Sequence, residues 1–297
     1  MIVDDLARFG PDRAPGAPVS LSEAQAYCRR LATTHYENFV VASWLLPRRV
    51  RQHLMNVYAY CRWADDLGDE VAIGGDTLAY LDWWEEELAA CYRGQARHPV
   101  FVALKETIAA CSLPSEPLHD LLAAFRRDQW QDSYETFDDL LAYCAKSANP
   151  VGRIVLHVAN AASEENVRLA DSICTGLQLA NFWQDVARDY DIGRVYLPRQ
   201  TLREFGYREA MLARRETNAA FRQVMRFEVD RAERFLKGGM PLARRVPRWL
   251  RTSAGMFIHG GLSVLQKIRR LDYDVWMTRV SLSKWDKWKT FARTVCG

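Results

Sequence analysis

The sequence contains no C-x-x-C pair, no basic start followed by an apolar run, and no uncharged apolar run long enough to cross a membrane. Its seven cysteines are an odd number, so we expect free thiols in a reducing cytoplasm and neither disulfides nor a zinc site. The longest uncharged run, residues 252–266, contains three glycines and a histidine. We therefore expect neither a signal peptide nor a membrane-spanning helix. The net charge of +3 gives no general reason to expect a nucleic-acid partner.

Sustained alternation of apolar and polar residues is also missing, which argues against a sheet-based fold. Helical spacing of apolar residues recurs instead, in a chain of 297 residues of which 49% are hydrophobic. Prolines and glycines gather in residues 1–19, which predicts an extended or flexible lead-in, and Ser20 with Glu23 predicts a capping box. The prediction is a single all-α domain over residues 20–297 with roughly ten helices. Breakers separate these helices at Pro47, 74–75, 94–99, 114–117, 149–152, 192–198, 238–241 and Pro247.

An acidic cluster ends the segment 54–70, which reads LMNVYAYCRWADDLGDE. Steps of three and four residues from Leu54 reach Asp65 and Asp69, so these carboxylates continue a helical face that begins as core. Asp65 and Asp69 lie about 40° apart around the helix, and Asp66 lies beside them. Buried carboxylates need a neutralising partner, and oxygen ligands in this arrangement suit Mg2+. The alternative is a solvated acidic helix end before a loop.

A second polar stripe follows helical steps of three, four and four residues through Gln178, Asn181, Asp185 and Asp189. Apolar residues flank this stripe on both sides, namely Leu177, Leu179, Phe182 and Val186. An ordinary surface helix has a broad polar face, so a narrow seam between apolar walls predicts the lining of a cation-filled cavity. The alternative is a polar strip at the rim between two helices. Two such helices facing each other would hold several Mg2+ ions around a diphosphate, and the ions would neutralise it as a leaving group.

The same residues belong to an ordered series of motifs: HYENF (35–39), YAYCR (58–62) running into DDLGD (65–69), YC through VGR (143–153), and QLANFWQDVARD (178–189) followed by RVYLP (194–198). Together they resemble the squalene/phytoene synthase family over nearly the whole chain after about residue 20. HYENF, SANPVGR and NFWQD are similar to its hydroxysqualene-forming branch in bacterial hopanoid pathways. Gly68 departs from that branch, which usually has Ala there, and lowers helix propensity by up to roughly 1 kcal/mol.

The resemblance implies an isoprenoid-synthase helical bundle with a central active-site cavity. It implies that presqualene diphosphate loses diphosphate, rearranges and captures water to give hydroxysqualene, with Mg2+ and without NADPH. The implied metal ligands are Asp65, Asp66, Asp69, Asn181, Asp185 and Asp189. The implied diphosphate contacts are His35, Arg62, Arg194, Tyr196, Arg279 and Lys287. The catalytic candidates, which place water or polarise the departing group, are Tyr143, Gln178 and Asn181.

Several of these residues have an ordinary structural alternative. Arg62 is placed one turn before Asp66 and suits either a phosphate or an i,i+4 ion pair. Tyr143 is either a catalytic residue or a packed aromatic, and His35 is either a satisfied buried histidine or a diphosphate partner. Arg279 and Lys287 would alternatively decorate an amphipathic tail. Aromatic residues suit the lining of a carbocation cavity, although most are simply core; the candidates are Phe39, Trp44, Phe182 and Trp183.

Two other activities stay open. One is head-to-head condensation of prenyl diphosphates to presqualene diphosphate, dehydrosqualene or phytoene, and the other is a non-catalytic assembly role. The resemblance also implies handover with an upstream presqualene diphosphate synthase and a downstream oxidoreductase. The basic stretch 267–293 carries three tryptophans and either rests on the inner face of the membrane or packs against the bundle. The expected location is the cytoplasm.

Overall fold

The computed structural model describes residues 2–11, 18–34, 46–69, 76–278 and 280, and they contain helices and no strand. In this part of the chain a single isolated bridge joins Ser133 and Val195. The all-α prediction is confirmed. Contacts divide the chain into two compact units: unit 1 comprises Met1–Trp130 with Ile154–Ala161, and unit 2 comprises Gln131–Arg153 with Ala162–Gly297. Residues predicted for the site or the cavity that lie outside the described part are His35, Phe39, Trp44, Arg279 and Lys287.

Unit 1 is built around α4, which packs against its neighbouring helices through an aromatic core. Its helices are α1 (Ile2–Phe9), α2 (Leu21–Thr34), α4 (Arg48–Asp69), α5 (Thr77–Tyr92), α6 (Pro99–Cys111) and α7 (Glu116–Arg127). Trp63 of α4 stacks on Trp84 of α5 with ring centroids 5.1 Å apart, and both rings meet the edge of His98. Burial lowers the pKa of His98 to about 3. The histidine is therefore neutral, and its Nδ1 accepts the Val100 N–H at 3.2 Å to cap α6.

The start of the chain corrects one prediction, because part of the lead-in is helical. Residues 2–9 form α1, and Phe9 packs edge-on against both Tyr27 and His98 at 5.5 Å. Asp5 accepts a hydrogen bond from the Tyr27 hydroxyl at 2.9 Å. Proline and glycine begin only at Gly10, so the breakers that suggested an extended segment leave the first nine residues free to form a helix.

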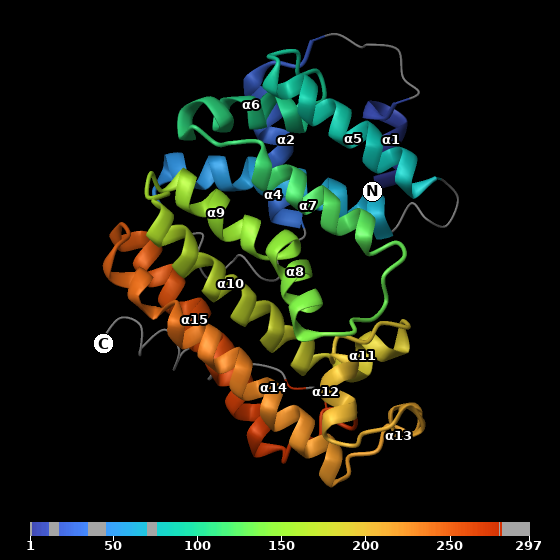
Figure 1. Cartoon of the computed structure of the whole chain (residues 1–297). Coiled ribbons are helices and arrows are strands. Elements are labelled where there is room, and N and C mark those ends of the chain that lie inside the picture. Colours follow the sequence, from blue (N-terminus) through green and yellow to red (C-terminus); the bar gives the residue numbers. More distant parts are fainter. Residues whose placement is uncertain (1, 12–17, 35–45, 70–75, 279, 281–297) are drawn as a thin grey trace. The chain divides into compact units, whose positions relative to one another are not determined.

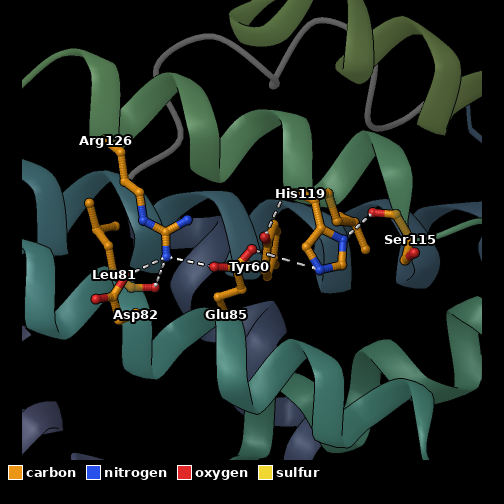
Figure 2. Close-up of polar contacts among 8 residues, drawn as sticks. Tyr60, Leu81, Asp82, Glu85, Ser115, His119 and Arg126 are labelled. Atoms are coloured by element: carbon orange, nitrogen blue, oxygen red, sulfur yellow. Dashed lines mark hydrogen bonds and ion pairs between the residues drawn. The ribbon is translucent and has the colours of Figure 1, made fainter.

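A polar network joins α5 to α7 in unit 1 (Figure 2). The Arg126 guanidinium donates to Asp82 and Glu85, both at 2.7 Å. His119 lies on the same side of α7, with its Nε2 3.9 Å from Glu85. Tyr60 of α4 donates to the carbonyl of Leu118 at 2.9 Å. These bonds join α4, α5 and α7 to one another, and we assign the network a structural role.

Unit 2 is centred on α10, which packs along α14 and α15 (Figure 1). Its helices are α8 (Phe137–Ser147), α10 (Glu164–Gln184), α11 (Val186–Asp191), α12 (Arg199–Glu204), α13 (Glu209–Ala213), α14 (Ala219–Gly238), the 3-10 helix η2 (Met240–Arg244) and α15 (Arg248–Arg270). One further helix, α9 (Asn149–Val158), begins in unit 2 and ends in unit 1. A Cβ on Gly176 of α10 would lie 2.8 Å from the Leu236 side chain of α14, so glycine permits this close approach.

Most predicted breakers coincide with helix ends. Ser20 and Glu23 form the predicted capping box, with the Glu23 N–H donating to Ser20 Oγ at 3.3 Å and the Ser20 N–H donating to Glu23 at 2.9 Å. The six described cysteines are free thiols, as expected. Among the described helices, none combines the length and apolar character needed to cross a membrane.

Candidate active site

The first acidic cluster lies at the C-terminal end of α4 and is neutralised from within its own helix. Arg62 donates to Asp65 at 3.1 Å and also forms an ion pair with Asp66. The structural alternative for Arg62 is therefore present. It does not exclude a phosphate contact, because a guanidinium has five N–H donors in a planar fork that matches phosphate oxygens. Asp69 is the last residue of α4, and its side chain is outside the described part.

The burial of α4 corrects the predicted stripe. The core face runs through Tyr60, Trp63 and Leu67, which are almost fully buried. The predicted line through Tyr58 and Cys61 is only half-buried, and the Asp65 side chain is 45% exposed. Asp66, predicted to flank the pair, is the buried acid, with its side chain 7% exposed. Helical steps give each residue's angle correctly, but the neighbouring helices decide which side of α4 is covered.

The second acidic stripe keeps the predicted helical spacing and apolar flanks. Asp185 is buried and Asn181 is exposed. Buried Leu179 and Phe182 form one apolar wall. The helix changes direction at Asp185, where α10 ends and α11 begins. The Asp185 N–H still bonds to the Asn181 carbonyl at 3.0 Å, and the Asp189 N–H bonds to the Asp185 carbonyl at 2.8 Å. This continuous hydrogen bonding keeps the three oxygen-bearing side chains at helical spacing through the bend.

The turn after α11 places Arg194 beside the stripe. Gly193 has a φ of +82°, in the left-handed region that favours glycine. The Gly193 N–H bonds to the Tyr190 carbonyl at 3.0 Å and the Arg194 N–H to the Asp189 carbonyl at 2.8 Å. These two bonds are the Schellman pattern that ends a helix. The backbone of the predicted diphosphate residue Arg194 is thereby fixed to that of the predicted metal ligand Asp189.

An aromatic wall stands next to the same stripe. Tyr196 stacks on Phe182 with ring centroids 3.8 Å apart and planes within 10°, and it stacks on Tyr134 at 5.8 Å. Tyr143 of α8 completes the group at 5.5 Å from Tyr134. The neighbouring pocket, which Arg194 also lines, has a volume of about 10 Å3, enough for one water. The pocket beside the wall is therefore small, and the ring faces of the wall suit a carbocation.

The structure brings most predicted site residues of unit 2 together and shows one that the sequence did not suggest. Gln178, Asn181, Asp185 and Asp189 share the stripe, while Tyr143, Arg194 and Tyr196 lie beside it. Tyr134 is 1% exposed and belongs to the wall. It precedes α8 in a segment without helical periodicity, so no spacing signal marked it. Trp183, a candidate cavity residue, is instead fully buried and donates to the Glu228 carbonyl at 3.1 Å.

The oxygen donors of the stripe fit Mg2+. Within the described residues no group of three or more His, Cys, Asp or Glu side chains gathers as a metal site. Two carboxylates and one amide nevertheless supply the kind of oxygen donor that Mg2+ takes, because it is usually bound by one or two protein carboxylates and completes its shell with water and substrate phosphate. Asp185 and Asp189 supply the carboxylates and Asn181 the amide. That the two acidic clusters face one cavity stays a prediction.

Comparison with known proteins agrees with the motifs. Residues 32–286 match the model of the squalene/phytoene synthase family. The chain is 37% identical to hydroxysqualene synthase of Rhodopseudomonas palustris over 220 residues, covering 73% of this chain and 74% of that protein. It is 31% identical to phytoene synthase of Arthrospira platensis over 286 residues, covering 91% and 92%.

Solved structures give the same result for the fold. The crystal structure of squalene synthase HpnC from Alicyclobacillus acidocaldarius superimposes with a TM-score of 0.83 at 44% sequence identity, covering 86% of this chain and 97% of that one. The helical architecture is therefore the isoprenoid-synthase fold. Both the sequence match and the shared fold extend over most of the chain, and the motifs lie within them. The chain belongs to the squalene/phytoene synthase family.

Proposed function

We propose that the chain is an isoprenoid synthase that converts presqualene diphosphate and water into hydroxysqualene and diphosphate. The observation that carries the proposal is the position of the Asn181–Asp185–Asp189 stripe directly beside the wall of Phe182 and Tyr196. Oxygen donors suit a metal-bound diphosphate and ring faces suit a carbocation. The ionisation of a prenyl diphosphate creates both charges at once. The similarity to hydroxysqualene synthases supports this product.

In the proposed reaction the carbon–oxygen bond of the substrate breaks and its electron pair leaves with diphosphate. The cation rearranges, and water attacks it and loses a proton. Asp65, Asp69, Asp185 and Asp189 would hold Mg2+, and the bound metal would supply Lewis-acid chemistry for the departure of diphosphate.

The other proposed site residues would orient the substrate and the attacking water, and would exclude other water from the cation. Arg194, beside Asp189, would hold a diphosphate oxygen through its guanidinium fork. Gln178 and Tyr143 would place the attacking water. The aromatic wall would keep other water away from the cation.

A second activity has its own support. Phytoene synthases match over a larger share of the chain than hydroxysqualene synthases do. We therefore retain head-to-head condensation of two prenyl diphosphates as the alternative. A non-catalytic assembly role is less favoured, because the second stripe keeps both carboxylates and its amide.

Product analysis by mass spectrometry distinguishes these activities. The purified protein is incubated with Mg2+ and no NADPH, with presqualene, farnesyl or geranylgeranyl diphosphate supplied separately. Hydroxysqualene from presqualene diphosphate alone supports the proposal, and products from either shorter substrate alone support condensation. An inactive protein that also fails to bind these diphosphates with Mg2+ would support the assembly role. Asp185→Asn serves as the inactive control.

A further inference from the structure

A second cavity lies in unit 2 between α12, α13 and the segment that follows α11. Its volume is about 400 Å3, within the range of small-molecule sites. Buried Leu202 and Leu212 supply an apolar floor. Three arginines line it, Arg199, Arg203 and Arg208. This combination fits an anionic ligand with room for a short apolar arm.

Local structure places the three arginines around one cavity. Arg199 and Arg203 are four residues apart on α12 and share one face, an arrangement of like charges that costs a helix stability. Gly206, with a φ of +70°, ends α12. Its N–H bonds to the Arg203 carbonyl at 3.0 Å. The chain therefore turns back, and Arg208 joins the same cavity.

The acidic partners of these three arginines do not neutralise all of their positive charge. Arg203 forms an ion pair with Glu135, whereas Arg199 Nη1 is 4.0 Å from Glu209, the limit of an ion pair. Within the described part of the chain, the Arg208 guanidinium forms no side-chain hydrogen bond or ion pair, although, after a hydrogen bond from Arg214, its charge helps to lower the pKa of Glu216. Exposed pairs of this kind contribute little to stability, so their loss to a bound anion costs little. Of the described residues that line the cavity, Glu209 alone is acidic, against three arginines.

The cavity adjoins the candidate active site. Tyr190, Val195 and Leu212 line it and also line the small pocket of Asp189 and Arg194. We propose that this cavity binds a phosphate-bearing anion without a metal ion, through Arg199, Arg203 and Arg208. The ligand is inorganic diphosphate or the diphosphate head of a prenyl substrate. Guanidinium forks recognise phosphate oxygens directly. This inference goes beyond the proposed function and does not depend on the reaction product.

Calorimetric titration in EDTA tests the proposal, because the aspartate site requires Mg2+ and this cavity does not. The probes are inorganic diphosphate and a non-hydrolysable farnesyl thiodiphosphate. Saturable binding of either probe is expected. Equal affinities identify the anion alone as the ligand, and at least tenfold tighter binding of the prenyl probe identifies the substrate head with its chain on the apolar floor.

Paired variants locate the binding. Arg199→Ala/Arg208→Ala is expected to weaken metal-free binding at least tenfold, and Arg199→Lys/Arg208→Lys should lose less because it keeps the charge. The matched control is Arg168→Ala/Arg234→Ala, on exposed parts of α10 and α14, with affinity unchanged within twofold. Asp185→Asn should bind the metal-free probe normally although its turnover is lost. No saturable binding in EDTA, or binding that the arginine variants leave unchanged, overturns the proposal.

Discussion

α4 and α10 share one local sequence pattern, but different contacts hold it in place in each helix. Each carries a buried tryptophan two residues before the first aspartate of its acidic cluster: Trp63 precedes Asp65, and Trp183 precedes Asp185. The Trp63 indole donates to the Tyr27 hydroxyl at 3.0 Å within a layer of stacked rings. The Trp183 indole donates to a backbone carbonyl of α14. The same anchor therefore depends on aromatic packing in unit 1 and on close helix–helix contact in unit 2.

The buried titratable groups beside these anchors have opposite chemistry. In unit 1, burial lowers the pKa of His98 and keeps it neutral. In unit 2, burial raises the pKa of Glu228, although Arg231 and the Thr201 hydroxyl, at 3.0 and 2.8 Å, partly offset it. The contributions of these two groups to stability should therefore change with pH in opposite directions.

The largest expected effect tests whether both acidic clusters serve the same reaction. Asp65→Asn and Asp185→Asn should each reduce turnover at least about 10³-fold, because each removes a charge that would hold the metal at the leaving group. Steady-state kinetics measures the loss, and circular dichroism should show unchanged helix content. Asp171→Asn on α10 is the control: it breaks the Arg153 pair at 2.8 Å and should leave turnover within about threefold of normal. Full activity of either Asp65→Asn or Asp185→Asn would contradict the shared role.

The close contact of α10 with α14 should tolerate no added methyl group. In Gly176→Ala the new Cβ would lie 2.9 Å from the Leu236 backbone nitrogen, which cannot move aside cheaply. Overpacking of this kind costs about 1–3 kcal/mol. Urea unfolding measures the loss, and an unchanged midpoint would show that α14 shifts freely.

Acid should weaken unit 1 through His98. Because its folded pKa is lowered, the stability it contributes is present above pH 6.5 and is lost as pH falls towards 3. At pH 5 the loss should reach about 2 kcal/mol. Urea unfolding at pH 7.5 and pH 5 measures it. His98→Asn keeps a capping side chain and should flatten this dependence; an equal slope in the variant would remove His98 as its source.

Glu228 should give the opposite sign in unit 2. Its folded pKa is raised above 4.5, so its contribution is fully present below pH 4.5 and is lost as pH rises. Glu228→Gln should therefore gain stability relative to the natural protein between pH 4.5 and 7. Parallel unfolding curves at these pH values measure the gain, and a constant difference would contradict it.

The smallest effect concerns Gly68 in α4, the counterpart of Gly176. The nearest atom to a Cβ there is Gln129 Nε2 at 3.7 Å, an ordinary contact. Gly68→Ala should therefore raise the free energy of unfolding by up to about 1 kcal/mol, through helix propensity. Thermal unfolding checks the sign, and a destabilised variant would show that the α4–α7 contact is tighter than it is in the structure.

As with these two glycines, features set within one helix could be predicted from the sequence, and features set by packing between helices could not. Periodicity describes one helix, so the stripe from Gln178 to Asp189 and its apolar walls followed from the sequence. Which side of α4 is covered depends on helices distant in the chain. The burial of Asp66 in place of Asp65 could therefore not be predicted from the sequence. Tyr134 and Arg194 lie in irregular segments, whose course helical periodicity does not predict. For Arg194 the glycine at 193 was a usable signal, since a helix-ending turn there brings it back to Asp189.

Alkylation of the buried cysteine thiols would report the opening of unit 1 and of unit 2 separately. Burial raises the pKa of Cys28, Cys61, Cys91, Cys144 and Cys174 to about 12, so almost none is reactive thiolate near neutrality. Cys28, Cys91 and Cys144 are also buried from solvent, so an alkylating reagent must wait until the surrounding helices open. Mass spectrometry of the modified peptides would read Cys28 and Cys91 as reporters of opening in unit 1, and Cys144 as a reporter in unit 2.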